Sequence, residues 1–268
     1  MYSITHHSFC SVYGPVRSWR YGISLGIDPI GTVSTCSFDC VYCQLGEIEH
    51  KTRDRQIFIP TIRILDDLHR FIPWDVDVIT LSGSGEPTLA LNLGEIISVT
   101  KTLTNKPVGV LTNGSLLMDG DVQEELALAD QVAVKWDAVT VDGFNRVNRP
   151  VAPVFFSEIW AGLMQFRQHY SGHLAIQTML LTPWPQPDQD VYIAQMQALQ
   201  PAEIQLNTPT RPRPLTHQLE ARGNHVPGDR AYPTRSLKPT SAETLHTFSD
   251  RIQAATGIQV RSALGVTA

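Results

Sequence analysis

The chain has 268 residues, 42% of them hydrophobic and 18% charged, with a formal net charge of −5. This length and composition predict one large folded domain and exclude a disordered or fibrous chain, while the negative charge argues against a surface that attracts nucleic acid as a whole. No apolar run reaches membrane-spanning length and no signal-peptide pattern begins the chain, so we expect a cytoplasmic protein without a membrane partner.

Short apolar runs alternate with amphipathic stretches of helical length. Near-continuous apolar strands separated by helices are typical of a parallel sheet covered by helices, and six such units predict an α/β fold with a partial (β/α)6 barrel of the TIM type. A doubly wound sheet is the alternative, although neither nucleotide-binding glycine motif of that class occurs. The pattern predicts strands over residues 23–27, 76–82, 108–112, 131–136, 174–179 and 203–207, and helices over residues 61–71, 93–104, 119–129, 156–170, 190–199 and 242–255.

One segment, residues 208–239, breaks this alternation. It is rich in Pro, Arg, His and Gly, which predicts a long loop, and loops of this length in a compact domain are usually functional or disordered. We therefore expect one domain over residues 1–268, with a core at about 20–210, this basic loop, and a C-terminal helix and strand within 240–268. The basic residues of the loop are Arg211, Arg213, Arg222, Arg230, Arg235 and Lys238, against the acidic Glu220 and Asp229.

Three cysteines, Cys36, Cys40 and Cys43, follow the first predicted strand at the spacing CxxxCxxC. Three thiolates on one short loop can converge on a metal centre. An iron–sulfur cube usually takes four cysteines, so three leave one iron open to a small molecule. A zinc site or three inert cysteines are the alternatives, although no second CxxC or CxxH pair is present. Cys10 stands apart, and we expect it to be an ordinary thiol.

The cysteine spacing, with the aromatic Tyr42 before the last cysteine, resembles the signature of the radical SAM superfamily. The run YGPVRSWRYGISLGIDPIGTVSTCSFDCVYCQLG resembles the opening of one subgroup, the Fe–S oxidoreductases related to the wyosine-forming tRNA-modifying enzymes. The segments SGSGEPTL, LTNG, FNRVNRP and IQLNTPTRP also resemble that subgroup, so the resemblance extends over residues 13–214. The wyosine-forming enzymes carry a second cluster on further upstream cysteines, whereas here only Cys10 precedes the motif, so a second cluster is not expected.

The resemblance implies a [4Fe–4S] cluster on Cys36, Cys40 and Cys43, with S-adenosylmethionine (SAM) chelated at its open iron. It further implies that one electron cleaves SAM to a 5′-deoxyadenosyl radical, which abstracts hydrogen from an unknown substrate. The electron would come from a donor such as a flavodoxin or ferredoxin. The protein's own task is then to bind, orient and exclude water.

Residues 82–88, SGSGEPT, follow the second predicted strand and are similar to the family's GGE-type element, which binds the methionyl amine of SAM. Glycines let the backbone approach a ligand, and Glu86 can accept from an ammonium group. The alternative is a glycine-rich turn with Glu86 in solvent. The residues expected to bind the cofactor are Tyr42, Ser82, Gly83, Gly85, Glu86, Pro87, Thr112, Asn113, Lys135, Asp137 and Gln177.

Thr112, Asn113, Lys135 and Asp137 end the third and fourth predicted strands, at the rim where barrel active sites gather. We expect Asp137 or Lys135 near the ribose or carboxylate of SAM, with an ordinary turn and a solvated strand end as the alternatives. Gln177 and Gln205 lie inside apolar strands, so their amides need partners, either a cofactor or neighbouring backbone groups.

Several arginines in the remaining resembling segments can bind a carboxylate or phosphate, or lie in a solvated basic loop. Two other functions stay open. The first is an RNA-modification factor that recognises tRNA or other RNA through segment 208–239, whose binding would weaken with salt. The second is an Fe–S electron-transfer protein without radical chemistry. The substrate cannot be predicted from these patterns. The arginines concerned are Arg146, Arg149, Arg211 and Arg213.

Overall fold

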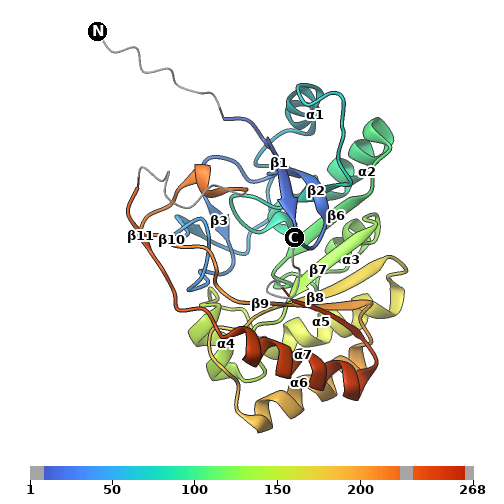
Figure 1. The fold of residues 1–268 in the computed structure, drawn as a ribbon. Coiled ribbons are helices and arrows are strands. Elements are labelled where there is room, and N and C mark those ends of the chain that lie inside the picture. Colours follow the sequence, from blue (N-terminus) through green and yellow to red (C-terminus); the bar gives the residue numbers. More distant parts are fainter. Residues whose placement is uncertain (1–8, 224–231, 263–268) are drawn as a thin grey trace.

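The computed structural model describes residues 9–223 and 232–262. Its main sheet has eight strands in the order β1-β2-β5-β6-β7-β8-β9-β12, and it curls into a partial barrel (Figure 1). All neighbouring strands are parallel except β1 and β2, which are antiparallel. The strands are β1 (Val12–Ser18), β2 (Gly22–Ile27), β5 (Val78–Leu81), β6 (Val108–Thr112), β7 (Gln131–Lys135), β8 (His173–Met179), β9 (Glu203–Asn207) and β12 (Gln259–Ser262).

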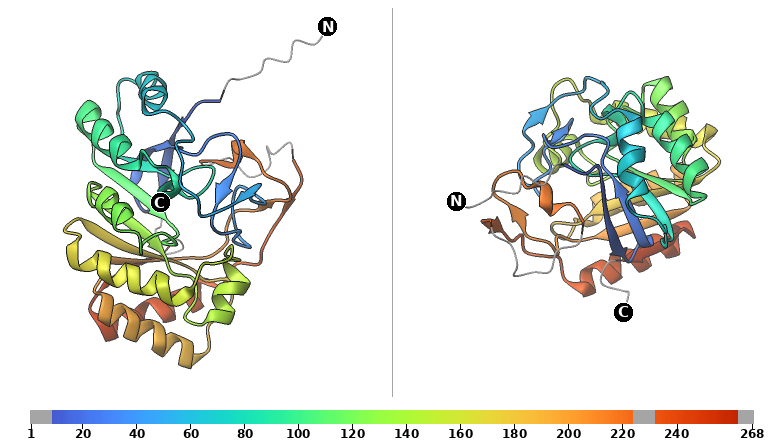
Figure 2. Two further views of the ribbon diagram at one scale, coloured as in Figure 1. Left: turned by 180° about the vertical axis from the view of Figure 1, so that it is seen from behind. Right: turned by 90° about the horizontal axis from the view of Figure 1, so that it is seen from above.

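Helices lie along the outside of the curled sheet, as both views in Figure 2 show. Local sequence fixes several of their ends. The Asp119 side chain caps α3, Ser241 caps α7, and Gly257 ends α7 in the left-handed conformation at φ 71°. Within the described residues no helix is both long and apolar enough to span a bilayer. The helices are α1 (Thr61–His69), α2 (Leu93–Thr104), α3 (Gly120–Ala127), α4 (Val141–Val147), α5 (Phe156–His169), α6 (Gln186–Leu199) and α7 (Ala242–Thr256).

The two faces of the sheet differ in character because successive side chains of a strand point to opposite faces. The face toward the helices is apolar, and residues such as Ile79 and Val132 belong to the buried core. On the other face a Cβ built at Gly109 would contact Thr80 and Gln131, so these three positions share the barrel interior. A packed barrel has branched apolar side chains at such positions, whereas here the inward residues are small or polar. The inward positions of this kind include Ser24, Gly26, Thr80, Gly109, Ala133 and Ala175.

The predicted fold class is confirmed: each of the six predicted strands is present, and they pair in parallel. Strand β1 and helix α4 were not predicted from the sequence. Gly14 and Pro15 interrupt the apolar pattern of β1, and its register with β2 shifts between Tyr13 and Val16. Helix α4 has seven residues, of which only Phe144 is buried, so it carries too little apolar periodicity to be recognised.

The predicted loop 208–239 is partly structured. It contains the two-residue strands β10 (Arg213–Pro214) and β11 (Thr234–Arg235), which pair with each other, and the 3-10 turn η2 (Leu219–Ala221). Residues 224–231 of this segment, among them Asp229 and Arg230, lie outside the described residues. Together with β3 (Thr35–Cys36) and β4 (His50–Lys51), the two strands gather on one side of the barrel (Figure 1).

Candidate functional site

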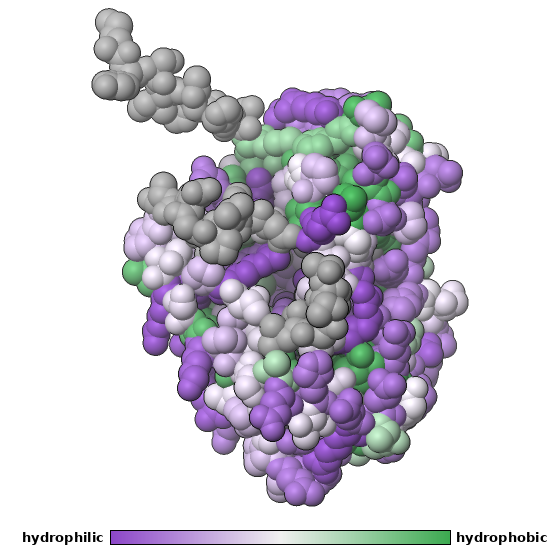
Figure 3. Space-filling model, viewed as in Figure 1, coloured by the Kyte–Doolittle hydropathy of each residue, from purple (hydrophilic) through white to green (hydrophobic). Residues whose placement is uncertain are grey.

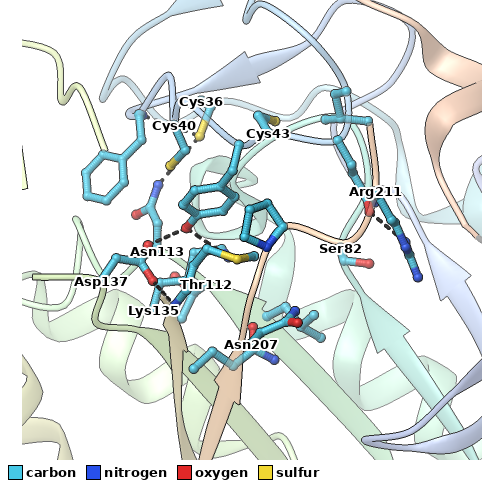
Figure 4. Close-up of a pocket in the computed structure, with 18 of the residues that line it drawn as sticks. Cys36, Cys40, Cys43, Ser82, Thr112, Asn113, Lys135, Asp137, Asn207 and Arg211 are labelled. Carbon is cyan, nitrogen blue, oxygen red and sulfur yellow. Dashed lines mark hydrogen bonds between the residues drawn. The ribbon is translucent and has the colours of Figure 1, made fainter. Parts of the chain in front are cut away.

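A pocket of about 370 Å³ occupies the barrel interior. Its lining comes from the cysteine loop, from the carboxyl ends of β5 to β9, and from the turn between β1 and β2. The close-up in Figure 4 shows the cysteines on one side and Lys135, Asp137 and Asn207 on the strands below them. Pockets that bind small molecules in proteins have volumes of roughly 300–1,000 Å³, so this one has the size of a ligand site.

Cys36, Cys40 and Cys43 line this pocket together, and none of them forms a disulfide. Backbone hydrogen bonds fix their loop over the end of β5: Thr35 N donates to Ser84 O (3.0 Å) and Glu86 N donates to Thr35 O (3.1 Å). Among the described residues, no three His, Cys, Asp or Glu side chains are close enough together to hold a single metal ion.

The charge environment of the thiols bears on what they can bind. Burial, with a further contribution from the Glu86 carboxylate, raises the pKa of Cys36 well above its ordinary value, and burial raises the pKa of Cys40 to about 12. Thiolates at these positions therefore need a positive partner, which the iron ions of a cluster provide. Three thiols that line one pocket are a donor set that fits a [4Fe–4S] cluster, which Cys36, Cys40 and Cys43 would hold with one iron left without a cysteine.

Glu86 joins the end of β5 to the end of β6. Its Oε1 accepts from Thr112 Oγ1 (2.6 Å), Thr88 Oγ1 (2.8 Å) and Thr88 N (3.1 Å), and its Oε2 accepts from Asn113 N (2.7 Å). Burial raises the pKa of Glu86, while these donors favour the charged form. With one donor on Oε2 and two lone pairs there, the carboxylate retains capacity for one further donor in the pocket.

Asp137, which follows β7, connects the cysteine loop to the sheet. Its Oδ2 accepts from Tyr42 Oη and from Asn148 Nδ2 (2.8 Å). Asn148 Nδ2 also lies 3.5 Å from Cys40 Sγ, and Lys135 Nζ lies 5.1 Å from the centre of the Tyr42 ring. Tyr42 is therefore held against a carboxylate and a lysine. The segment FNRVNRP contains Asn148, but its sequence did not reveal this role.

Most of the predicted cofactor residues reach the pocket, but Pro87 does not, because it begins the buried 3-10 turn η1 (Pro87–Leu89). Gln177 Nε2 donates to Gln205 Oε1 (2.9 Å) across β8 and β9, and Gln205 Nε2 donates to Glu203 Oε1. Of the four arginines predicted to bind an anion, Arg211 lines the pocket, while Arg146, Arg149 and Arg213 are not among its lining residues. The predicted residues that line it are Cys36, Cys40, Tyr42, Cys43, Ser82, Gly83, Gly85, Glu86, Thr112, Asn113, Lys135, Asp137 and Gln177.

The described part of the basic segment packs against the protein. Arg222 Nη1 forms an ion pair with the fully buried Asp28 (2.7 Å), and Arg213 Nη2 lies 3.5 Å from Asp39 of the cysteine loop. Gln218 N donates to Leu45 O (2.9 Å) in the same loop. Two of the charges considered for RNA recognition therefore hold the segment to the pocket rim. No sequence pattern singled out Asp28.

Comparison with known proteins gives the class. Residues 30–191 match the family model "Radical SAM superfamily". A crystal structure of SuiB from Streptococcus suis bound to S-adenosylmethionine superposes on this chain with a TM-score of 0.59 at 10% identity. The match covers 88% of this chain and 46% of SuiB, so this chain spans about half the length of that protein. At this identity the likeness shows the fold alone.

Two relatives narrow the class. A UPF0026 protein of Synechocystis sp. is 54% identical over 96% of this chain and 97% of its own length. A UPF0026 protein of Methanocaldococcus jannaschii is 33% identical over 75% of this chain and 64% of its own length. The chain belongs to the radical SAM superfamily and, within it, to the UPF0026 proteins. The superfamily uses a [4Fe–4S] cluster and SAM.

Proposed function

We propose that this chain holds a [4Fe–4S] cluster on Cys36, Cys40 and Cys43, binds SAM beside it, and uses the pair to abstract hydrogen from a second substrate. The observation that carries the proposal is the joint lining of one pocket by the three cysteines and by polar groups at the carboxyl ends of five strands, β5 to β9. When bound and reduced, the cluster supplies one electron to SAM, whose cleavage yields the 5′-deoxyadenosyl radical.

The chain's own residues bind and orient the cofactor. Oε2 of Glu86 can accept from the methionyl ammonium, because one of its lone pairs is left. The backbone at Gly83 and Gly85 lies at the same edge of the pocket. Asp137 can accept from a ribose hydroxyl and Lys135 can donate to the carboxylate, while Tyr42 contacts both residues. These assignments are proposals for each residue.

A pure electron-transfer role would need no ligand pocket next to the cluster. The cavity of about 370 Å³ beyond the cysteines therefore favours an enzyme over an electron carrier. An electron must still arrive from outside, and we propose a flavodoxin or ferredoxin as the donor.

The test is anaerobic reconstitution with iron and sulfide, reduction with dithionite, and measurement of 5′-deoxyadenosine formed from SAM. Cys40→Ala should lose the cluster absorbance and the product. Cys10→Ala is the matched control, because Cys10 is not among the residues lining the pocket, and it should keep its full iron load. Absence of 5′-deoxyadenosine from fully loaded wild type, or an intact cluster in Cys40→Ala, would contradict the proposal.

A further inference from the structure

The pocket extends well beyond the residues proposed to hold SAM. Those residues lie at the carboxyl ends of the strands, whereas the opposite part of the pocket is lined by residues 17–20, which form the end of β1 and the start of the turn to β2. The pocket lining reaches as far as Trp19 and Arg20, and on the face drawn in Figure 3 hydrophilic residues lie beside a central hollow. This end of the pocket can therefore receive a polar second substrate.

Arg20 is the distinctive residue at that end. Its guanidinium lies 5.2 Å from the centre of the Trp19 ring, and its Nε is buried without a hydrogen-bond partner in the described parts of the chain. A neighbouring arginine is satisfied: Arg261 Nη1 lies 3.6 Å from the Glu203 carboxylate and donates to Arg20 O (3.0 Å). Arg261 thus engages that carboxylate and fixes the turn that carries Arg20.

An unpartnered buried donor destabilises a folded protein, so such a group in a native fold calls for an explanation. Burial also disfavours the charge and lowers the pKa of Arg20. An anionic group bound beside the guanidinium would favour its charge and so offset part of this cost. A guanidinium is a planar fork of donors that matches a carboxylate or phosphate in a bidentate geometry, and stacking on an aromatic ring holds that fork in a fixed plane.

The charges of the pocket point to the same kind of ligand. Its two acidic residues, Glu86 and Asp137, accept hydrogen bonds from several protein groups. The four basic residues are distributed around the rest of the lining, and Arg211 approaches from the segment after β9 (Figure 4). The pocket is therefore basic in a chain whose net charge is −5. Its basic lining residues are Arg17, Arg20, Lys135 and Arg211.

We propose that the second substrate carries an oxyanion, a carboxylate or a phosphate group, and that the Arg20 guanidinium binds this group at the β1–β2 end of the pocket. The proposal rests on the proposed function, because it assigns SAM to the other end. It makes Arg20 a residue that determines specificity.

Isothermal titration calorimetry tests this directly. The cluster-loaded full chain, saturated with SAM, is titrated with inorganic phosphate, pyrophosphate and succinate at constant ionic strength in chloride. At least one probe should bind, and Arg20→Gln should weaken that binding about tenfold or more, the usual scale for a charged hydrogen bond. Arg146→Gln is the matched control, because it removes the same charge from an exposed position on α4 outside the pocket lining, and it should change affinity less than about twofold.

The probes also separate the two oxyanions, since tighter binding of a phosphate probe assigns a phosphate and tighter binding of succinate a carboxylate. If Arg20→Gln fails to fold, Arg20→Lys keeps the charge but loses the planar fork, and it should still bind more weakly than wild type. Failure of every probe to bind wild type, or wild-type affinity in the folded Arg20 variant, would overturn the inference. The heat of binding does not depend on SAM cleavage, so the two hypotheses can fail separately. Formation of 5′-deoxyadenosine without probe binding would contradict the role of Arg20 but not the proposed function. Probe binding without 5′-deoxyadenosine would contradict the proposed function and leave an oxyanion site at Arg20.

Discussion

The substitution Asp28→Asn should strongly destabilise the folded protein. The Asp28 side chain is fully buried at the end of β2. Its Oδ1 accepts from Ile30 N (3.0 Å) and Gly31 N (3.2 Å), and its Oδ2 accepts from Ser84 Oγ (2.6 Å), Ser84 N (3.0 Å) and Arg222 Nη1 (2.7 Å). One carboxylate thus connects the first parallel strand, the SGSGE loop and the basic segment.

An asparagine offers one acceptor oxygen where the aspartate offers two. If that oxygen serves Ile30 and Gly31, the amide nitrogen faces Arg222 and the backbone N–H of Ser84, which are both donors. The Arg222 charge then stays partly buried without a counterion. Breaking one side of a buried ion pair costs about 3–5 kcal/mol, and each kcal/mol lowers the melting temperature of a domain of this size by about 2–4 °C. The expected decrease in melting temperature is therefore roughly 6–20 °C.

Thermal unfolding of the cluster-free protein, followed by circular dichroism, measures this effect. Asp54→Asn is the matched control, because Asp54 is exposed, and it should shift the melting temperature by no more than about 2 °C. In the Arg222→Leu background, Asp28→Asn should cost less than in wild type, with a coupling of about 0.5–3 kcal/mol. A melting temperature close to wild type for Asp28→Asn, or strictly additive effects, would refute this account of the ion pair.

Two further substitutions test other contacts. Gly85→Ala should destabilise the protein by about 1–3 kcal/mol and loosen cluster binding, because its Cβ would overlap Thr35 O, whereas Gly120→Ala meets open space and should be nearly neutral in the same melts. Equal melting temperatures for the two variants would contradict this packing. Asp67 is buried, which opposes its charge, but bonds from Ser11 and the charge of Arg63 outweigh burial and lower its pKa below 3.8. The ionised form of Asp67 therefore stabilises the fold above about pH 4. Wild type should be more stable than Asp67→Asn in that range, and the difference in stability should disappear as the pH falls through the lower folded-state pKa. A stability difference that does not change with pH would contradict the assignment.

The sequence predicted those parts of the molecule that a short stretch of chain determines. The six parallel strands follow from runs of Val, Ile and Leu, and the cysteine loop follows from its spacing. The predicted start of the helix at residue 119 and the predicted end at residue 255 lie within a residue or two of the ends of α3 and α7, which Asp119 and Gly257 cap in the structure. Each of these signals comes from residues close together in the sequence, so no knowledge of the tertiary fold is needed to recognise it.

Long-range contacts were not predictable in the same way. Arg222 and Asp28 are 194 positions apart, and nothing local distinguishes this arginine from a solvated one. The bond between Gln177 and Gln205 could have been found, because the two residues occupy corresponding positions in predicted neighbouring strands and pair in register. The role inferred for Arg20 could not be predicted from the sequence either. It depends on a buried Nε without a hydrogen-bond partner in the described residues, which only the packed structure reveals.

The most direct test of the central claim is electron paramagnetic resonance of the reduced, cluster-loaded protein before and after addition of SAM. We predict the spectrum of a [4Fe–4S] cluster that changes when SAM is added, because the ligand would enter the coordination of the one iron without a cysteine. Cys10→Ala should behave as wild type. A reduced cluster whose spectrum is unaffected by SAM would show that its irons are closed to this ligand, and would contradict the assignment of the three cysteines and the pocket to SAM chemistry.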